Sequence, residues 1–490
     1  MPANGTPDAS DYRDAGGAPV IVRIRGECAE VLLMLDLAGA RVLVVGLGDT
    51  GLSMVRWLHR HGADVVAADT RAAPPAAEVL QREYPRLPLL LGGVADDEVH
   101  RAEVIAVSPG IDRRGGAIAA AAKRGVPVVG DIELFAQSLA ARGDAPPVLA
   151  ITGSNGKSTV TAMAGEICAA AGLRPLVAGN IGLPVLDALG EIEDGAPMPG
   201  AIVLELSSFQ LESTASLRPQ AATVLNLSED HLDRYDGMNE YASAKARIFG
   251  GDGLQLLNRD DAWSRGMALA GRRRVTFGLD APEAGEDWGL GNAGTTLRRG
   301  PHELAPVDVL RVAGLHNAAN ALAAAALCRA IAVADGAIVE GWRRFEGLPH
   351  RVKNINKINN ISFYDDSKGT NVGATVAALT GLREPVVLIA GGDGKGQDFA
   401  PLAAAARGRA RAIVLIGRDG PRIAAAVGND VPLCRARDMD EAVELAFRSA
   451  QPGDAVLLSP ACASYDMYRN YVHRAEVFAE AVLALQRRCA

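Results

Sequence analysis

The sequence predicts an α/β protein built from three tandem domains. Its 490 residues are too many for one compact core, because a domain usually has about 100–200 residues. Short apolar runs rich in Val and Ile recur along the chain, and Ala-rich segments of helical composition separate them. That alternation is typical of βαβ units and a parallel sheet. Hydrophobic residues make up 49% and charged residues 22%, which argues against wholesale disorder and fibrous repeats.

The first domain is expected over residues 37–145. Before it, residues 1–36 are rich in Gly, Ala, Pro and Asp with weak periodicity, so we expect a mobile N-terminal extension. Four β-branched runs are expected to be strands of a parallel sheet: 41–45, 64–68, 104–107 and 126–129. The segment RGDAPP at 142–147 indicates a linker to the next domain.

The second and third domains repeat this alternation. The central domain is expected over 146–347, with buried strands at 148–152, 201–206 and 222–227. Residues 278–306 are rich in Gly, Glu and Arg and should form loops and hairpins, and a helix should begin near Asn317. EGLPHR at 346–351 is the expected hinge. The C-terminal domain, 348–490, has predicted strands from Ile361 and at 385–390, 412–416 and 455–459.

Charge, cysteine spacing and hydropathy exclude several classes of function. The 50 Lys and Arg against 58 Asp and Glu give a net charge of −8 without a basic stripe, so we expect no nucleic acid partner. Residues 318–334 are Ala-rich and contain Asn320 and Arg329, which indicates an interior helix and no membrane insertion. No secretory signal is recognisable. The cysteines form neither a CxxC pair nor a zinc pattern and are expected to be reduced thiols in the cytoplasm: Cys28, Cys168, Cys328, Cys434, Cys462 and Cys489.

A Gly-rich turn, Gly46-Leu-Gly48-Asp-Thr-Gly51, follows the first predicted strand and opens a helix, and Asp69 ends the next strand. This is the layout of a dinucleotide fingerprint, in which glycines let the ligand approach the backbone and the helix N-terminus attracts phosphate. The turn therefore indicates a site for NAD(P) or another nucleotide diphosphate. A turn without a ligand is the alternative interpretation.

The segment Thr152-Gly-Ser-Asn-Gly-Lys157-Ser158-Thr159 indicates a phosphate-binding loop more strongly, since it joins a buried strand to a helix. Backbone N–H groups of such a loop bind phosphates, the lysine contacts terminal phosphoryl oxygens, and the serine hydroxyl binds Mg²⁺. Ile151 stands where the usual pattern has its first glycine. We therefore expect a tighter variant that begins at Gly153.

Polar residues follow the two other central strands. Glu205 ends one strand, and His231 lies in a dense polar run, NLSEDHLD, after the next. Because carboxyl ends of parallel strands meet at one edge, these residues and the phosphate loop should converge on one cleft. Taken singly, Glu205 could simply emerge from the sheet, His231 could be structural, and Lys245 could be an exposed lysine on a helix.

Three polar segments follow strands of the third domain: DDSKGTN at 365–371, GGDGKG at 391–396 and SPACAS at 459–464. The second is cationic and flexible enough to contact an anionic substrate, although such loops are also ordinary turns. Cys462 has no His or Asn partner pattern, so we expect a buried structural cysteine and not a nucleophile.

With these motifs the chain resembles the Mur ligases, the ATP-dependent amide ligases of peptidoglycan precursor synthesis, from about Arg41 to Arg474. TGSNGKST and HNAAN at 316–320 resemble motifs of the whole family. Motifs that resemble its D-glutamate-adding members are GDIELF (130–135), ELSSFQLE (205–212), HLDRY (231–235), GLPHR (347–351), DDSKGTN, GGDGKGQDF (391–399) and SPACASYD (459–466). Tyr471 departs from the family pattern, because phenylalanine is usual there.

The resemblance implies a Rossmann-like N-terminal domain, a central P-loop-type ATPase domain with a mostly parallel sheet, and a Rossmann-like C-terminal domain. It implies ATP-binding residues Gly153, Asn155, Gly156, Lys157, Ser158, Thr159, Asn317, Asn320, Arg351 and Asp366. A UDP-linked substrate would contact Asp49, Thr50, Asp69, Thr70, Arg71, Ser108, Gly110 and Asn180. D-glutamate would contact Thr370, Lys395, Ser464 and Tyr471.

The resemblance also implies the chemistry. Magnesium, as one ion or two, would be bound by Ser158, Glu205, His231 and Lys245, the last of which matches the family's N6-carboxylated (carbamylated) lysine. The catalytic residues would be Lys157, His231, Lys245 and Lys395. The expected activity is ATP-dependent addition of D-glutamate to UDP-N-acetylmuramoyl-L-alanine through an acyl phosphate, by a cytoplasmic monomer.

Three alternatives stay open from the residues alone. An oxidoreductase using the N-terminal fingerprint for NAD(P) would leave the phosphate loop unexplained. A different ligase of the same family, such as a folylpolyglutamate synthase, would share that loop. A nucleotide-binding scaffold without activity is disfavoured, because the metal-ligand candidates Glu205, His231 and Lys245 are all present.

Overall fold

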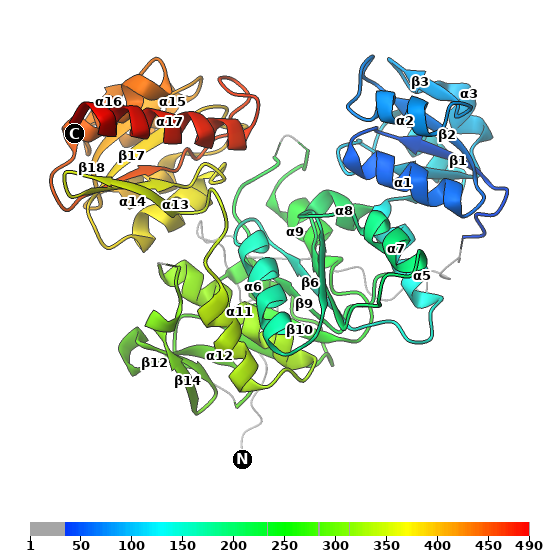
Figure 1. Ribbon diagram of the computed structural model, residues 1–490, viewed down its shortest axis with the longest axis horizontal. Coiled ribbons are helices and arrows are strands. Elements are labelled where there is room, and N and C mark those ends of the chain that lie inside the picture. The colour runs from blue at the N-terminus through cyan, green and yellow to red at the C-terminus, as the bar shows by residue number, and fades with distance from the viewer. Residues whose placement is uncertain (1–34, 233, 283–284, 313, 490) are drawn as a thin grey trace.

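A computed structural model describes residues 35–489 apart from 233, 283–284 and 313, and confirms the three-domain α/β architecture. Each of three bodies in Figure 1 is built around its own sheet: the N-terminal body at upper right, the central body below, and the C-terminal body at upper left. Most of the expected N-terminal extension lies outside the described residues.

The N-terminal sheet is parallel, with strand order β3-β2-β1-β4-β5, as in a Rossmann-like domain. β1 is buried along VLVV, because helices cover both faces of the sheet. Its strands are β1 (Arg41–Val45), β2 (Asp64–Asp69), β3 (Leu89–Leu91), β4 (Val104–Val107) and β5 (Val128–Val129). Its helices are α1 (Asp49–Arg60), α2 (Ala77–Glu83), α3 (Asp96–Arg101), α4 (Gly116–Lys123) and α5 (Asp131–Ala140).

The central sheet has the order β14-β13-β12-β11-β10-β9-β6-β8-β7 and is parallel except for the β12-β13-β14 hairpins at one edge. Those hairpins confirm the expectation for residues 278–306. The strands are β6 (Val148–Thr152), β7 (Pro175–Gly179), β8 (Ala201–Glu205), β9 (Ala221–Val224), β10 (Leu254–Asn258), β11 (Arg274–Phe277), β12 (Trp288–Gly291), β13 (Thr296–Arg299) and β14 (His302–Pro306).

The helices of the central body are α6 (Lys157–Ala170), α7 (Val185–Glu193), α8 (Ser208–Glu212), α9 (Met238–Ala246), α10 (Ala262–Gly266), α11 (Leu315–Ala330) and α12 (Asp335–Arg344), with 3₁₀ turns at Asn292–Gly294 and Val307–Val309. α11 is the expected interior helix and begins two residues before Asn317. α12 packs closely on α6, since a Cβ at Gly341 would lie 2.6 Å from Ile167 Cα. Among the described residues, no helix has both the length and the hydropathy to cross a membrane.

The C-terminal sheet has the order β15-β16-β20-β17-β18-β19, and only β15 is antiparallel to its neighbour. Its strands are β15 (Lys353–Ile358), β16 (Ile361–Asp365), β17 (Val386–Gly391), β18 (Ala410–Ile416), β19 (Leu433–Arg435) and β20 (Ala455–Leu458). Its helices are α13 (Val372–Gly381), α14 (Ala400–Ala406), α15 (Gly420–Val427), α16 (Met439–Ser449) and α17 (Tyr471–Cys489). Because β20 lies between β16 and β17, the three polar segments after these strands share one edge.

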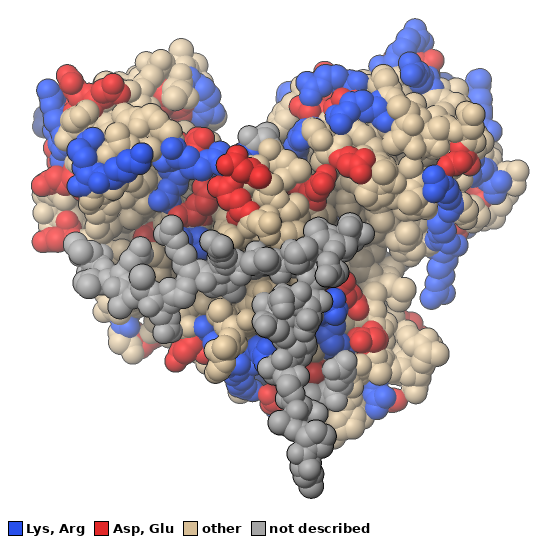
Figure 2. Space-filling view, turned by 180° about the vertical axis from the view of Figure 1, so that it is seen from behind, with Lys and Arg blue, Asp and Glu red and all other residues tan. Residues whose placement is uncertain are grey.

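The N-terminal domain rests on the central domain through α1 and α5. Arg60 of α1 pairs with Asp194 at the end of α7 (Nη1–Oδ1 2.5 Å). Glu133 of α5 accepts hydrogen bonds from the backbone N–H groups of Ala215 (2.6 Å) and Ser216 (2.8 Å). Glu133 belongs to the GDIELF segment, so that motif joins the two domains. On the face that Figure 2 shows, acidic and basic side chains are interspersed over the bodies.

Candidate active site

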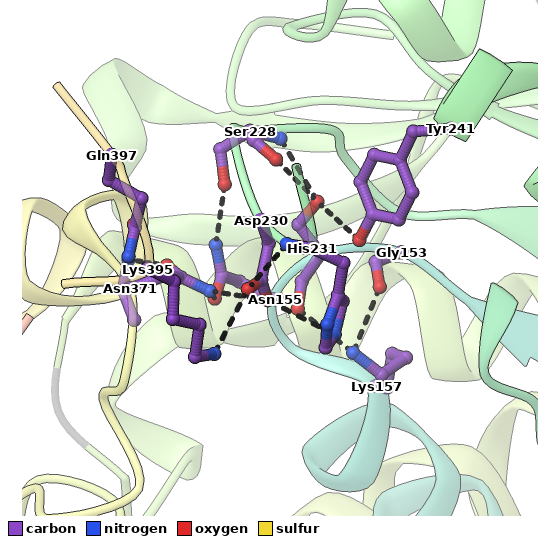
Figure 3. A network of polar contacts seen from close by, with 12 residues as sticks. Gly153, Asn155, Lys157, Ser228, Asp230, His231, Tyr241, Asn371, Lys395 and Gln397 are labelled. Carbon is purple, nitrogen blue, oxygen red and sulfur yellow. Dashed lines mark hydrogen bonds and ion pairs between the residues drawn. The ribbon is translucent and has the colours of Figure 1, made fainter. Parts of the chain in front are cut away.

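The phosphate loop runs from β6 into α6, as the sequence predicts. Gly156 has a φ of 83°, and a Cβ there would lie 2.6 Å from Asn320 Oδ1, so only glycine suits this position. The loop leaves the first N–H groups of α6 available for an anion, since α6 has no side-chain cap. Lys157 Nζ folds back and donates to the carbonyls of Gly153 and Ser154, each at 2.9 Å (Figure 3). In this position burial lowers the pKa of Lys157, and the charges of Glu205 and Asp230 oppose that effect.

The predicted convergence of three loops is observed. β6 lies between β8 and β9, so the phosphate loop, Glu205 and the segment with His231 leave adjacent strands at the same edge. Asn226, after β9, accepts from Ser154 N with its backbone carbonyl and from Asn155 N with its side chain, both at 2.9 Å. These bonds hold two of the loops together.

Glu205 is buried, with 2% of its surface exposed. Its Oε1 accepts a hydrogen bond from Asn180 Nδ2 at 2.9 Å, while its Oε2 is buried and has no hydrogen-bond partner among the described residues. A buried carboxylate oxygen without a partner is costly, and a bound cation would remove that cost. Glu205 therefore suits the predicted role of metal ligand.

Lys245 is also 2% exposed, so the alternative interpretation as a surface lysine is wrong. Its Nζ donates to Gly153 O (2.9 Å) and Thr152 Oγ1 (3.3 Å), at the start of the phosphate loop. The Tyr241 ring lies 4.7 Å from the same nitrogen. Burial, and then the nearby Lys157 ammonium, hold the pKa of Lys245 well below its usual value. Such an environment favours the neutral amine.

His231 and Asp230 lie side by side in the loop after β9. The His231 backbone has a φ of 55°, and its Nε2 is 3.6 Å from Asp230 Oδ2. Burial lowers the pKa of His231 despite the opposing charge of Asp230, so the imidazole is mostly neutral near pH 7. Asp230 was not predicted. The polar run NLSEDHLD marked the segment, but nothing in it distinguished Asp230 from its acidic neighbours.

Arg351 and Asp366 lie on the C-terminal side of the hinge, and Arg351 reaches the phosphate loop. Arg351 Nη2 donates to Ser158 Oγ at 2.9 Å, which places this predicted ATP-site residue on the loop. Asp366 Oδ2 accepts from Ser459 Oγ at 2.6 Å. Burial raises the pKa of Asp366 to about 7, although that hydrogen bond and Arg351 act in the opposite direction. Two further predicted residues, Asn317 and Asn320, bond to each other (3.2 Å) on α11.

The predicted D-glutamate residues lie on the polar edge of the C-terminal sheet. Backbone hydrogen bonds between Asp393 and Ala463 (2.9 and 2.8 Å) join the Lys395 loop to the segment with Ser464. Tyr471 OH accepts from Lys368 Nζ at 3.0 Å, two residues before Thr370. Cys462 is buried in the same segment, and burial raises the pKa of its thiol to about 12, which agrees with the expectation that it is not a nucleophile.

In the N-terminal domain, Asp69 organises the Gly-rich turn. It accepts hydrogen bonds from the backbone N–H groups of Leu47 (2.7 Å) and Arg71 (2.8 Å). The Arg71 guanidinium holds the pKa of Asp69 well below its usual range. Ser108 Oγ donates to Gly46 O at 2.6 Å. The other residues predicted for the same ligand in this domain begin α1 or follow β2 and β4: Asp49, Thr50, Thr70 and Gly110.

The structure separates Asn180 from those residues. Asn180 was predicted to contact the same UDP-linked ligand, but it follows β7 in the central domain and bonds to Glu205. A ligand that contacts both Asp69 and Asn180 must span two domains. Among the described residues, no three His, Cys, Asp or Glu side chains are grouped so as to hold a metal by themselves.

Three family models match the chain in series. They are described as Mur ligase MurD-like, N-terminal domain (residues 40–130), Mur ligase middle domain (151–328) and Mur ligase, glutamate ligase domain (350–462). Their order agrees with the three sheets.

Two curated relatives are similar over nearly the whole chain. UDP-N-acetylmuramoylalanine–D-glutamate ligase from Methylobacillus flagellatus is 56% identical over 458 residues, which cover 93% of this chain and 99% of the relative. The enzyme of the same name from Thiobacillus denitrificans is 57% identical over 468 residues, which cover 92% and 98%.

Solved structures share the fold at low sequence identity. UDP-N-acetylmuramate-alanine ligase from Thermotoga maritima has a TM-score of 0.57 and 19% identity, over 91% of this chain and 100% of that one. Folylpolyglutamate synthase from Mycobacterium tuberculosis has a TM-score of 0.51 and 16% identity, over 72% and 92%. At such identities the similarity concerns the fold alone.

Proposed function

The chain belongs to the Mur ligase family, and on that premise we propose that it is the ATP-dependent ligase that joins D-glutamate to UDP-N-acetylmuramoyl-L-alanine in peptidoglycan precursor synthesis. The observation that carries the proposal is the similarity, at 56% and 57% identity and almost full coverage, to relatives that bear this activity in their names. The geometry of the site supports it, because the phosphate loop, the buried Glu205 and Lys245, and the C-terminal polar loops meet at one place.

The reaction proceeds in two steps. The γ-phosphoryl group of ATP passes to the terminal carboxylate of the UDP-linked substrate, which gives an acyl phosphate and ADP. The amine of D-glutamate then attacks the acyl carbon, loses a proton, and forms the amide as inorganic phosphate leaves. Lys157 and the N-terminus of α6 stabilise the charge that moves from ATP to the carboxylate. We assign the incoming D-glutamate to Lys395 and Ser464, whose loops are joined by the Asp393–Ala463 bridge.

Magnesium suits the side chains at the edge of the central sheet. Glu205 offers a buried oxygen that has no hydrogen-bond partner among the described residues, Ser158 lies in the first turn of α6, and His231 lies in the loop after β9. When bound, the ion neutralises phosphate charge. Lys245 would supply an anionic oxygen ligand after its neutral amine added CO₂ and released a proton to give a carbamate, since oxygen ligands suit Mg²⁺ and an ammonium does not. The low pKa of Lys245 supports this modification.

The UDP-linked substrate and D-glutamate reach the site from the N-terminal and the C-terminal domain, respectively. The UDP group binds the Gly-rich turn around Asp69, and the rest of the molecule extends past Asn180 to Glu205. D-glutamate enters at the C-terminal edge. We place the domain boundaries near 145 and 347, where linkers join the three sheets. We infer a cytoplasmic location because ATP and UDP-linked substrates are cytosolic metabolites. We infer a monomer because all the residues of the proposed site come from one chain.

An assay of ADP release tests the proposal. With UDP-N-acetylmuramoyl-L-alanine present, D-glutamate should stimulate ADP release, whereas L-glutamate and L-alanine should not. Stimulation by L-glutamate with a folate in place of the UDP substrate would indicate a folylpolyglutamate synthase. Tight binding of NADH, without binding of the UDP ligand, would indicate an oxidoreductase. Absence of any ADP release at saturating substrates would refute the proposed activity.

A further inference from the structure

Asp230 lies where the central domain meets the C-terminal domain, and both of its carboxylate oxygens contact the C-terminal domain (Figure 3). Lys395 Nζ donates to Oδ1 across 3.2 Å, and Asn371 Nδ2 donates to Oδ2 across 3.4 Å. Asp230 is only 8% exposed, so water screens these contacts weakly. One carboxylate of the central domain thus binds two side chains from loops that follow different strands, β16 and β17.

Those two loops form one unit. The Gln397 side chain accepts from Val372 N at 2.9 Å and donates to Gly394 O at 3.0 Å, which ties the Lys395 loop to the start of α13. Asn371 caps that helix, because its side chain accepts from Ala374 N at 2.8 Å. Moving Lys395 relative to Asn371 would break these bonds. Asp230 therefore bonds to the Lys395 loop and to Asn371 at the start of α13, and hydrogen bonds already hold these two segments together.

The same unit also contacts the phosphate loop. Asn371 Nδ2 donates to Asn155 Oδ1 at 3.0 Å, and Asn155 Nδ2 donates to Ser228 Oγ at 3.2 Å. Asn155 belongs to the phosphate loop, and Ser228 belongs to the same loop as Asp230 (Figure 3). A shift of the C-terminal unit would consequently disturb the phosphate loop as well as Asp230.

Lysine has three N–H donors, and Asp230 accepts only one of those of Lys395. Among the described residues the other donors of Lys395 have no hydrogen-bond partner, so they can bind a substrate carboxylate while the bond to Asp230 holds the side chain in one direction. We propose that Asp230 is a positioning residue, which aims Lys395 at a carboxylate of D-glutamate and, through Asn371, docks the C-terminal domain on the phosphate loop. The inference rests on the proposed function, which supplies the D-glutamate.

Substitution of Asp230→Asn keeps the shape of the side chain and removes its charge. We expect the KM for D-glutamate to rise about 10- to 100-fold, because a charge-assisted bond to Lys395 is lost. The KM for ATP should stay within about threefold, because Asn371 still bonds to Asn155 of the phosphate loop. Asp236→Asn makes the same chemical change at an exposed position of the same segment and should leave both constants unchanged. An unchanged KM for D-glutamate, or equal rises for both substrates, would overturn the proposal.

A double-mutant cycle tests whether Asp230 affects D-glutamate binding through Lys395 or by a separate route. If Asp230 acts through Lys395, adding Asp230→Asn to Lys395→Ala should change the KM for D-glutamate by less than about threefold beyond Lys395→Ala alone. If the two effects multiply, Asp230 does not work through Lys395 and the positioning role is wrong.

Hydrogen exchange tests the docking without any turnover. Asn371→Asp keeps the helix cap, since aspartate accepts equally well from Ala374 N, but it faces Asp230 with a second carboxylate. Amides of residues 394–397 should exchange at least tenfold faster in Asn371→Asp and Asp230→Asn than in the wild type, with Asp236→Asn as control. Exchange at the wild-type rate in Asn371→Asp would overturn the docking role even if Asp230→Asn did not fold. If the wild type released no ADP, the proposed function would be refuted but the docking role would not, because the exchange experiment needs no turnover.

Discussion

A lysine amine reacts with CO₂ only in its neutral form, and the surroundings of Lys245 favour that form. Burial and the neighbouring Lys157 hold its pKa well below the usual value. An ammonium at this position would also repel a magnesium ion, by roughly 8 kcal/mol for charges of +1 and +2 at about 4 Å and an effective dielectric constant of about 20. A carbamate reverses the sign of that interaction.

Lys245→Ala should therefore be nearly inactive, with ADP release reduced at least about 100-fold. Small carboxylic acids added to the buffer should restore part of the activity, because a carboxylate can enter the vacated space and replace the missing anion. Lys123→Ala removes an exposed lysine from the last turn of α4, matching the position of Lys245 in α9, and should be fully active. Normal ADP release by Lys245→Ala would contradict the carbamate outright.

The raised pKa of Asp366 predicts that the stability of the protein depends on pH. Burial raises its pKa to about 7, so between pH 4 and 7 the folded state retains a proton that the unfolded state, with a carboxyl pKa of about 3.9, has released. Stability must then fall as pH rises through this window. At 1.36 kcal/mol per pKa unit, the wild type should lose up to about 3 kcal/mol between pH 5 and pH 8 relative to Asp366→Asn.

Urea denaturation of both proteins at pH 5 and pH 8 measures this difference. The exposed Asp144→Asn serves as the control and should follow the wild type at both pH values. Equal pH dependence in Asp366→Asn and the wild type would mean that Asp366 ionises normally in the folded protein. Asp366→Asn should also weaken ATP binding, so that a gain in stability at pH 8 accompanies a loss of function.

At the scale of elements, the phosphate loop was predictable because a Gly-rich segment between a buried strand and a helix is a local signal. Glycine at 156 is required by a φ of 83° and by the approach of Asn320 Oδ1. Central strands such as β6 and β17 were predictable because continuous Val, Leu and Ile runs are buried on both faces.

Several strands escaped prediction for physical reasons. β3 has only three residues, and β7 begins with proline. The apolar pattern of β10 is interrupted by Gln255, whose side chain bonds to the Met267 carbonyl at 2.7 Å. Their strand character comes from neighbours in the sheet. Asp230 escaped for a similar reason, since its partners Lys395 and Asn371 are more than a hundred positions away in the sequence.

Gly156→Ala tests the loop as an element. The left-handed backbone costs an alanine roughly 1–2 kcal/mol, and the added Cβ also collides with Asn320 Oδ1. We expect ATP affinity to fall at least tenfold, as measured by calorimetry with a non-hydrolysable analogue. Gly172→Ala has a similar φ of 76° just beyond the end of α6 and no atom within 4 Å of its Cβ. It should lower thermal stability comparably and leave ATP affinity unchanged, whereas normal affinity in Gly156→Ala would contradict the steric argument.

At the scale of the whole molecule, the site exists only because the edges of two sheets meet. Arg351 bonds to Ser158, and Lys395 bonds to Asp230, although the partners lie in different domains. The sequence predicts which edge of each sheet is polar, because every motif follows a strand. How the domains turn those edges toward each other depends on side-chain contacts such as these and could not be predicted from local pattern.

The last consequence is that the two nucleotide groups, UDP and ATP, bind in different domains. Among the described residues, the Lys157 amine donates hydrogen bonds only to Gly153 and Ser154 of its own loop, while Asp69 and Arg71 belong to the N-terminal domain. Lys157→Ala should abolish ADP release and leave the affinity for the UDP-linked substrate within about threefold of wild type. Arg71→Ala should do the reverse, weakening the UDP ligand while an ATP analogue still binds normally. Calorimetry with each ligand on both variants measures the four affinities. If Lys157→Ala also lost the UDP-linked substrate, the two sites would be coupled, and the placement of the UDP and ATP groups in different domains would be refuted.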